Sequence, residues 1–472
     1  MPTLAAMSPI LDTLEFDADL ISRYDGTGPR YTSYPTALQF HGGFGEAQLR
    51  LAAKASNEDP VPRPLSLYVH VPFCFSPCFY CGCNRVITRD MAKADRYLEQ
   101  LYREASLVAP LFDRDRPVRQ LHFGGGTPNF LDIRRMAELM DSLARHFSFL
   151  RGDEREYGIE LDPRFADAGY VRALGRLGFN RVSVGIQDFD PQVQQAVNRV
   201  QSEAQTRKVI EAARDAGFGS ASVDLIYGLP RQSIDGFRRT LQQVIELDPD
   251  RVAVYGYAHL PALFKAQNQI KATELPDPAT RLGLLRTALE MLTAAGYIYI
   301  GMDHFARADD ELARAQQAGS LQRNFQGYST HGGCDIVGLG VSAISRIGDS
   351  YSQNARDLVG YYAALDGGRL PVARGIALGE DDLIRREAIN QLMCHGWLDK
   401  AAFGERHRLL FDVYFAEVLE RLAAMEQDGL VRMDPHQIRV TPRGRMLSRI
   451  IAMCFDAYLG GAQPAQRYSR TI

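Results

Sequence analysis

Four cysteines within ten residues are the part of the sequence that most directly suggests chemistry. Cys74, Cys78 and Cys81 follow a CxxxCxxC spacing in the segment HVPFCFSPCFYCGC. A fourth cysteine, Cys83, comes two residues later. A 4Fe-4S cluster is normally held by four thiolates at other spacings, so three thiolates at this spacing would leave one iron for another ligand. An open coordination position is typical of a catalytic metal site.

Zinc is the alternative occupant for such a group of thiols. A structural zinc site usually takes its ligands as two separated pairs, and the sequence offers no second pair, which favours the iron-sulfur interpretation. Seven cysteines are an odd number, and so dense a cluster fits metal binding in a reducing compartment better than disulfide pairing. Cys394 and Cys454 stand apart and are expected to be small buried residues.

A glycine-rich run and three polar residues on apolar segments follow the cysteines. In HFGGGTP (122–128), Gly125 and Gly126 would let backbone amides approach a zwitterionic ligand closely, although such a run also suits a tight strand-to-helix turn. Polar residues on apolar strands need hydrogen-bond partners, which a ribose, an ammonium group or the protein itself would supply. These residues are Glu160 in GIELD, Gln187 in VGIQ and Asp224 in VDLIYG.

The elements that would position these residues alternate from residue 66 to about 300. Short β-rich runs alternate with amphipathic stretches such as 94–112 and 233–247, the pattern of βα units on a parallel sheet. A complete eight-stranded barrel would need two more units, so the sequence predicts an α/β fold with a partial (β/α)6 TIM-like barrel. Chemistry gathers at the carboxyl ends of such strands. The predicted strands are 66–71 with its flank, 119–124, 156–162, 181–187, 220–228 and 251–259.

Two segments flank the predicted barrel. Residues 1–60 form an N-terminal arm that contains RYDGTGPRYTSYPTA, and DPVPRPL is a linker into the first strand. Residues 61–365 would be the catalytic domain with an extension to the barrel. Residues 366–472 would be a mainly helical domain whose hairpin, DGLVRM and QIRVTP, resembles a winged helix. Nucleic-acid binding is not expected, because no broad basic surface accompanies this outline.

The composition excludes several classes of protein. With 472 residues, 46% hydrophobic and 24% charged, the chain is typical of a globular protein with one large and one smaller domain. A net charge of -3 gives no overall basic field. The first twenty residues carry Asp12 and Glu15 without a positive region, unlike a signal peptide, and no uncharged run reaches the roughly 18 residues of a membrane span. We therefore expect a cytoplasmic protein.

The cysteine spacing followed by the glycine-rich run resembles the radical S-adenosylmethionine superfamily. In that superfamily, S-adenosylmethionine chelates the fourth iron and one electron from the cluster yields methionine and a 5'-deoxyadenosyl radical. Over nearly the whole chain the resemblance narrows to the oxygen-independent coproporphyrinogen III oxidase family. It rests on GPRYTSYPTA (28–37), LSLYVHVPFC (65–74), CGCN (81–84), HFGGGTP (122–128), GFNRVSVGIQDF (178–189), VNR (197–199), DLIYGLP (224–230), YAHLP (257–261), GMDHFA (301–306), RNFQGY (323–328) and GVSAISRIGD (340–349).

The resemblance implies a set of site residues. Cys74, Cys78 and Cys81 would be the cluster ligands, and Cys83 and Gln326 would act in catalysis near the cofactors. Arg30 is our own candidate for a substrate carboxylate, because its planar guanidinium suits one; a functionless exposed arginine is equally expected. The family would hold two S-adenosylmethionine molecules, the first against Tyr68, Gly125, Glu160 and Ile344 and the second against Tyr80, Gly126, Thr127, Gln187, Arg199, Asp224 and Ala258.

The implied reaction converts two propionates of coproporphyrinogen III to vinyl groups and gives protoporphyrinogen IX. Hydrogen is removed from a propionate β-carbon, and carbon dioxide and one electron then leave. The electron donor and acceptor are not identified by the sequence, and a monomer is expected. The alternative is a haem-binding carrier, because close relatives that bind and deliver haem share the cluster motif. The carrier branch lacks the fourth cysteine of CGC and the GPRYTSYPTA arm. This chain has both features, and they favour the enzyme.

Overall fold

The computed structural model describes residues 14–152 and 154–460, which form two compact units. The barrel unit comprises residues 39–284 and 333–378 and contains the cysteine loop. The terminal unit comprises residues 14–38, 285–332 and 379–460 of the described chain. Each of the three segments expected from the sequence therefore contributes to both units.

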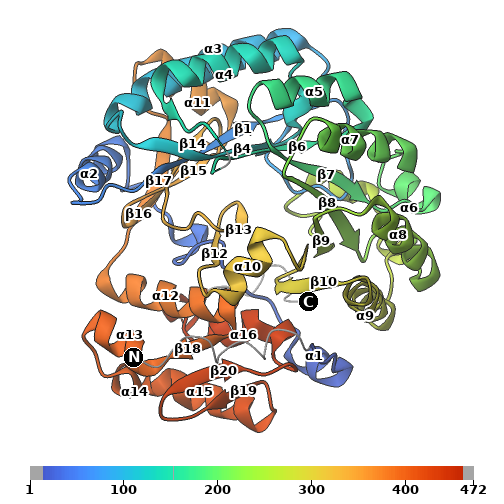
Figure 1. The fold of residues 1–472 in the computed structure, drawn as a ribbon, viewed down its shortest axis with the longest axis vertical. Coiled ribbons are helices and arrows are strands. Elements are labelled where there is room, and N and C mark those ends of the chain that lie inside the picture. Colours follow the sequence, from blue (N-terminus) through green and yellow to red (C-terminus); the bar gives the residue numbers. More distant parts are fainter. Residues whose placement is uncertain (1–13, 153, 461–472) are drawn as a thin grey trace. The chain divides into compact units, whose positions relative to one another are not determined.

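A row of parallel strands forms the centre of the barrel unit (Figure 1). The strands are β1 (Leu65–Val71), β4 (Pro117–Gly125), β6 (Glu156–Leu161), β7 (Arg181–Gln187), β8 (Ser220–Tyr227) and β9 (Arg251–Gly256). They lie side by side in the order β9, β8, β7, β6, β4, β1, and each neighbouring pair is parallel. This order follows from right-handed βαβ crossovers, which add each strand beside the last. The predicted partial barrel is confirmed.

Helices connect the parallel strands and lie along the outer side of the sheet (Figure 1). They are α3 (Met91–Val108), α4 (Ile133–His146), α5 (Ala168–Arg176), α6 (Pro191–Ala196), α7 (Glu203–Asp215) and α8 (Ile234–Leu247). Asp90, Asp132 and Ser202 are the N-caps of α3, α4 and α7, and each side chain accepts a hydrogen bond from a backbone amide in the first turn. Helix α9 (Pro278–Ala294) spans the division between the units.

The barrel unit continues beyond β1 with strands from later in the chain. β14 (Asp335–Leu339) pairs parallel with β1, and β15 (Ile344–Ile347), β16 (Ser350–Asn354) and β17 (Val372–Ala377) follow as antiparallel neighbours. Helices α2 (Glu46–Asn57) and α11 (Leu358–Asp366) also belong to this unit, as do the short strands β2 (Phe73–Cys74), β3 (Val86–Ile87) and β5 (Ser148–Phe149). This is the extension that the sequence placed after the barrel.

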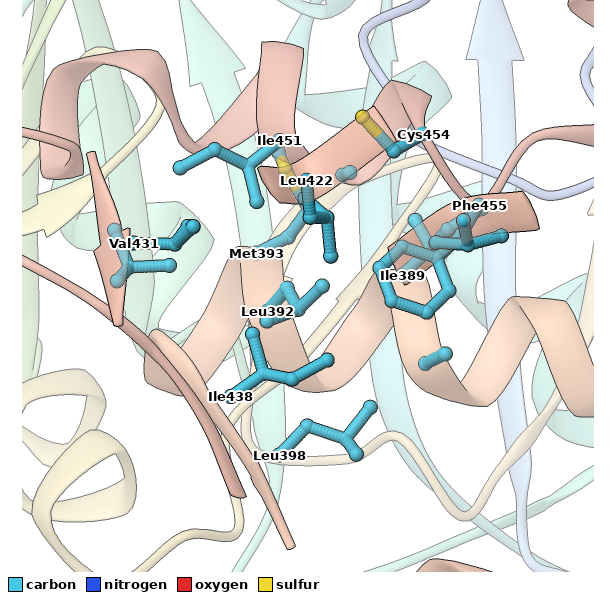
Figure 2. Packing of buried hydrophobic residues seen from close by; sticks show 14 of the residues in the cluster. Ile389, Leu392, Met393, Leu398, Leu422, Val431, Ile438, Ile451, Cys454 and Phe455 are labelled. Carbon is cyan, nitrogen blue, oxygen red and sulfur yellow. The ribbon is translucent and has the colours of Figure 1, made fainter. Parts of the chain in front are cut away.

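The terminal unit is mainly helical. Its helices are α1 (Ala18–Tyr24), α10 (Glu311–Gln317), α12 (Glu380–His395), α13 (Lys400–His407), α14 (Phe411–Tyr414), α15 (Ala416–Gln427) and α16 (Ser448–Met453). Figure 2 shows its core, where Leu392 of α12, Leu422 of α15 and Ile451 of α16 pack together with strand residues. Cys394 and Cys454 are both buried, as expected. No helix within 14–152 and 154–460 is long and apolar enough to cross a membrane.

Short strands complete the terminal unit. β10 (Tyr297–Gly301) pairs with β11 (His304–Arg307), and β12 (Gln322–Asn324) pairs with β13 (Gly327–Ser329), each as an antiparallel hairpin. The predicted winged-helix hairpin is present as β19 (Val431–Met433) and β20 (Gln437–Val440). A further strand, β18 (Trp397–Asp399), pairs with β20 and makes this sheet three-stranded.

Candidate cofactor site

The cysteine loop begins where β1 ends, at the carboxyl edge of the parallel strands. Its base is closed by β2 and β3, where Cys74 pairs with Ile87 and the Thr88 amide donates to the Cys74 carbonyl at 3.0 Å. Cys74 and Cys78 are buried, Cys81 is half-buried and Cys83 is exposed. The structure therefore presents the three predicted cluster ligands on one loop and leaves the fourth cysteine toward solvent.

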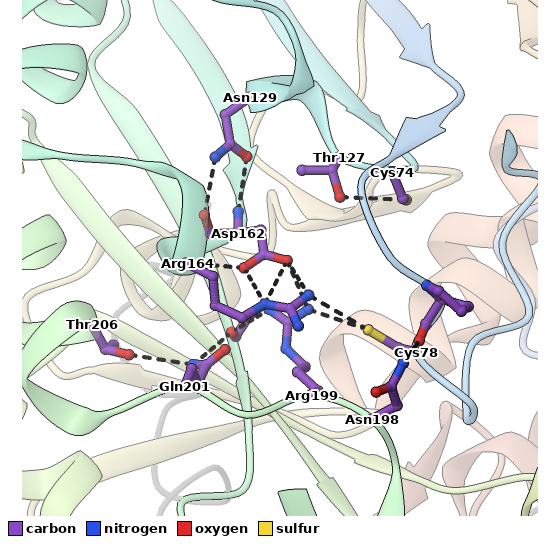
Figure 3. A network of polar contacts seen from close by, with 12 residues as sticks. Cys74, Cys78, Thr127, Asn129, Asp162, Arg164, Asn198, Arg199, Gln201 and Thr206 are labelled. Atoms are coloured by element: carbon purple, nitrogen blue, oxygen red, sulfur yellow. Dashed lines mark hydrogen bonds and ion pairs between the residues drawn. The ribbon is translucent and has the colours of Figure 1, made fainter. Parts of the chain in front are cut away.

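The VNR motif at 197–199 holds this loop from another part of the chain. The Phe79 amide donates to the Val197 carbonyl at 3.0 Å, and Asn198 donates from its side chain to the Pro77 carbonyl at 2.7 Å. Arg199 then reaches Cys78, with its Nη1 3.6 Å from the sulfur (Figure 3). Arg199 was predicted as a contact for S-adenosylmethionine, and in the structure it also secures the loop.

Two arginines approach the Cys78 sulfur, and one aspartate pairs with both of them (Figure 3). Asp162 accepts from Arg164 at 2.6 Å and from Arg199 at 3.2 Å, and Arg164 Nη2 lies 3.9 Å from the sulfur. Burial opposes ionisation of Asp162, but Arg199 and Arg164 outweigh it and lower the pKa of this carboxyl. The two guanidiniums thus place positive charge beside the Cys78 sulfur. Neither Asp162 nor Arg164 was predicted from the sequence, although Asp162 is the polar residue that ends the predicted strand 156–162.

The other thiols differ in their surroundings. Burial raises the pKa of Cys74 to about 11, although the Thr127 hydroxyl donates to its sulfur at 3.4 Å. Cys83 donates from its thiol and backbone to Cys81, and this, with Arg85, lowers the pKa of Cys81 to about 6. The loop therefore supplies donors and cations around sulfur atoms that must become thiolates to bind iron.

A cubane cluster fits this donor set better than a single ion. No three or more His, Cys, Asp and Glu side chains in the described ranges are grouped so as to hold one metal ion. Each thiolate of a cubane binds a different iron, so the ligands of a cluster need not converge on one point. Three cysteines on one loop, with arginines to balance thiolate charge, have the chemistry that a 4Fe-4S cluster requires.

Polar side chains of the parallel strands form a second part of the site. Glu160 accepts from His122 Nε2 at 3.2 Å, and the His122 ring stacks on Tyr68 with 6.0 Å between centroids. His70 Nε2 donates to the Asn84 carbonyl at 3.0 Å, so its Nδ1 accepts the Tyr68 hydroxyl at 3.2 Å. Tyr68 and Glu160, both predicted cofactor contacts, are thus joined through His122, which the sequence analysis did not single out.

Asp224 continues this row toward β7. It accepts a hydrogen bond from the Ser183 hydroxyl at 3.1 Å. Burial, then the nearby Glu160 carboxylate, raises the pKa of Asp224 to about 7, against the opposing effects of Ser183 and Arg199. A carboxyl held in this way can accept from a ribose hydroxyl or an ammonium group.

The glycine-rich turn is required by the protein's own packing. A Cβ on Gly125, where φ is +121°, would lie 2.7 Å from the His70 ring, and one on Gly126 would lie 2.8 Å from the Phe73 carbonyl. The Gly126 amide already donates to the Val71 carbonyl at 2.8 Å. The tight turn therefore accounts for these glycines, and their contact with a cofactor remains a prediction.

The remaining predicted contacts of the barrel unit lie in three places. Gln187 has φ +69° at a β-bulge, and a Cβ on Gly185 would meet both its amide and the Arg199 guanidinium. Buried Gln267 donates to the Tyr80 carbonyl at 3.0 Å and to the Ala258 carbonyl at 3.1 Å. Gln267 thereby joins two predicted contacts, and no sequence signal marked it. Ile344 begins β15.

Gln326 and Arg30 belong to the terminal unit. Both amide atoms of Gln326, Oε1 and Nε2, are buried without a hydrogen-bond partner among the described residues. Arg30 pairs with Asp303 through its guanidinium. The unsatisfied amide indicates a ligand for this part of the unit.

A buried carboxyl supports the strand ends of the barrel unit. Glu104 is 1% exposed and accepts from the Gly340 amide at 2.7 Å and from Asn354 and Tyr361. On the same helix, the Tyr97 hydroxyl donates to the His70 carbonyl at 2.7 Å. Helix α3 thus fixes the backbone after β14 and at the end of β1.

We expect the free energy of unfolding to depend on pH through the titration of Glu104. Burial raises its pKa from 4.5 to about 7, although all three hydrogen bonds lower it. The contribution of the neutral Glu104 carboxyl to the free energy of unfolding is thus complete below pH 4.5 and is lost as pH rises through about 7. Relative to Glu104→Gln, the wild type should lose about 3 kcal/mol of unfolding free energy over this window. Denaturant unfolding at several pH values measures the difference.

The exposed Glu138→Gln variant is the matched control and should follow the wild type across the pH range. A constant difference between wild type and Glu104→Gln would contradict the raised pKa.

Comparison with known proteins assigns the family. A model of the radical SAM superfamily matches residues 68–244, and a model of the HemN C-terminal domain matches residues 378–447. The oxygen-independent coproporphyrinogen III oxidase of Pseudomonas aeruginosa is 52% identical over 98% of this chain and 100% of its own length. That of Escherichia coli is 49% identical over 97% of this chain and 99% of its own.

A solved structure gives the same result. Coproporphyrinogen III oxidase (HemN) from Escherichia coli, described as a radical SAM enzyme, superposes with a TM-score of 0.89 at 48% identity and covers 94% of this chain and 100% of its own. Sequence, fold and the cysteine loop therefore agree that this chain belongs to the oxygen-independent coproporphyrinogen III oxidase family of the radical SAM superfamily.

Proposed function

We propose that this chain oxidatively decarboxylates two propionates of coproporphyrinogen III to vinyl groups without oxygen, giving protoporphyrinogen IX. The cysteine loop at the carboxyl end of β1, with Arg164 and Arg199 against Cys78, is the observation that carries the proposal. Cys74, Cys78 and Cys81 would hold a 4Fe-4S cluster. With S-adenosylmethionine, the cluster would supply a radical that abstracts hydrogen. The protein would bind and orient the substrate and exclude water from the site.

We propose contacts for two S-adenosylmethionine molecules. Glu160 and Asp224 provide carboxyl oxygens for ammonium or hydroxyl groups, and Arg199 provides a guanidinium whose Nε is buried without a partner among the described residues. The first molecule would contact Tyr68, Gly125, Glu160 and Ile344, and the second Tyr80, Gly126, Thr127, Gln187, Arg199, Asp224 and Ala258. Cys83 and Gln326 would act near the cofactors, and Arg30 would bind a substrate carboxylate.

An anaerobic assay tests this function. Purified protein with reconstituted cluster, a reductant, S-adenosylmethionine and coproporphyrinogen III should form protoporphyrinogen IX. A haem titration addresses the carrier alternative, because tight stoichiometric haem binding without porphyrinogen turnover would favour a carrier.

The same assay should consume two S-adenosylmethionine molecules for each porphyrinogen. Each decarboxylation begins with a separate hydrogen abstraction, so about two methionines should form per pair of vinyl groups. Chromatography of methionine and porphyrin from the same reaction measures the ratio. Reactions without porphyrinogen give the uncoupled cleavage to subtract, and a corrected ratio near one would indicate a recycled radical.

We further propose a cytoplasmic monomer that works with an electron donor and an acceptor and binds no nucleic acid. The dense thiol cluster supports a reducing compartment. Residues 61–365 would carry the catalysis, with 1–60 as an N-terminal arm and 366–472 as a C-terminal helical domain.

A further inference from the structure

A group of arginines gathers in the terminal unit around two hairpins and the arm. Arg323, on β12, donates from Nε to the Arg30 carbonyl at 3.3 Å, and its guanidinium lies over the Tyr328 ring at 4.8 Å from the centroid. Arg449 is 3% exposed and donates from Nε to the Pro29 carbonyl at 2.7 Å. The arm backbone at Arg30 is therefore held by two other arginines of the same unit.

The β12–β13 hairpin carries several buried polar atoms without partners among the described residues. They are Nη1 of Arg323, Nδ2 of Asn324, and both Oε1 and Nε2 of Gln326. Buried polar groups are nearly always hydrogen-bonded, and an unmade bond costs free energy. Since most of these atoms are donors, a ligand with acceptor oxygens would satisfy them.

Several charged groups also gather in this region. Asp303 forms an ion pair with Arg30. Asp303 and Arg323 also lie close enough to Arg449 to affect its pKa. Burial, then Arg323, lowers the pKa of His304 to about 4, so this imidazole is neutral at pH 7. Burial, then Arg30, lowers the pKa of Arg449 to about 10, which still leaves it charged. Asp303 thus lies near the guanidiniums of Arg30, Arg323 and Arg449.

Asp303 is presented by an unusual turn. Gly301 pairs with His304 across the β10–β11 hairpin, so Met302 and Asp303 form a two-residue loop, with φ of +41° and +76°. Glycine and asparagine are the usual residues in such a turn, and a methionine with positive φ is strained. Strain of this kind persists where a function requires the geometry. The turn brings a carboxylate to the guanidinium of Arg30.

We propose that Arg323 and Gln326 form a carboxylate-binding site that anchors one propionate of the porphyrinogen, and that Asp303 occupies Arg30 until a substrate carboxylate replaces it. This inference rests on the proposed function, because the substrate supplies the carboxylates. Arg323 would offer a paired guanidinium fork to the carboxylate oxygens, and the Gln326 amide would donate beside it. The neutral His304 leaves the positive charge to the arginines.

Binding of coproporphyrin III, the aromatic form of the substrate ring system, tests the site by fluorescence anisotropy. The holoenzyme with cluster and S-adenosylmethionine is titrated anaerobically with the free tetra-acid and with its tetramethyl ester. Arg323→Gln should weaken binding of the acid by about tenfold to a hundredfold and leave the ester unchanged. Asp303→Asn should tighten binding of the acid by about threefold to tenfold, because the competing carboxylate is gone.

The opposite expected changes in affinity, weaker for Arg323→Gln and tighter for Asp303→Asn, distinguish an anion-binding site from a structural ion pair. If the ion pair between Arg30 and Asp303 only holds the arm in place, Arg323→Gln and Asp303→Asn should both weaken binding and lower the melting temperature. Arg314→Gln, an exposed arginine on α10, is the matched control and should bind like the wild type. Should Arg323→Gln fail to fold, Asp303→Asn decides alone, and weaker binding of the acid by that variant overturns the proposal.

Wild-type turnover is measured separately. If the wild type forms vinyl groups but Arg323→Gln binds the acid as tightly as Arg314→Gln, the anchor is wrong and the proposed function stands. If the wild type forms no vinyl groups, the proposed function fails, whatever the variants bind.

Discussion

Alanine at Cys78 is expected to abolish both iron binding and methionine formation. Only two thiolates would remain for the cubane, and Arg164 and Arg199 would lose the sulfur that both approach. Arg164 and Arg199 would keep their ion pairs with Asp162 but would lose these contacts with the cysteine loop. Iron and sulfide content after anaerobic reconstitution and methionine release without substrate measure the two effects.

Cys454→Ala is the matched control for this experiment. Cys454 is buried in the core of the terminal unit, so its loss should reduce stability and leave iron content unchanged. Full iron content and methionine release in Cys78→Ala would show that the cluster ligands have been misassigned. Cys74→Ala and Cys81→Ala should behave like Cys78→Ala.

Serine at Cys83 should separate cluster binding from the later chemistry. Cys83 is exposed at the end of the loop and donates to Cys81 from its backbone at 3.4 Å, a bond that serine retains. A hydroxyl has nearly the size of a thiol and little of its capacity to carry a proton or an electron. We therefore expect the Cys83→Ser protein to keep its iron and bind S-adenosylmethionine but to lose most vinyl formation.

Iron content, S-adenosylmethionine binding and vinyl product are measured on the same preparation. Loss of iron from Cys83→Ser would make Cys83 a ligand, and near-normal vinyl formation would make it a packing residue. Either result contradicts a role in proton or electron transfer. Cys334→Ser, which makes the same change at a buried thiol of the barrel unit, controls for the general effect of the substitution.

The sequence alone determined the local elements and the chemical class of the site. Strand β7 has the predicted bounds, 181–187, because an apolar alternation between turn residues specifies a strand without reference to the rest of the chain. The CxxxCxxC spacing placed three predicted ligands on one loop for the same reason, since neighbours in sequence stay neighbours in space. Cys394 and Cys454 were correctly expected to be buried from their isolation in apolar segments.

The tertiary structure decided which distant residues meet. Arg199 reaches Cys78 across 121 positions of sequence because the segment after α6 is hydrogen-bonded to the loop after β1, through Val197 and Asn198. Asp162, Arg164 and Gln267 join the site through contacts between distant segments, and their residue types alone could not distinguish them from ordinary polar residues. Arg323 became a candidate only when burial left its nitrogen without a partner. Hydrophobic periodicity specifies which face of an element is buried, whereas pairing between elements depends on crossovers and packing that no local pattern encodes.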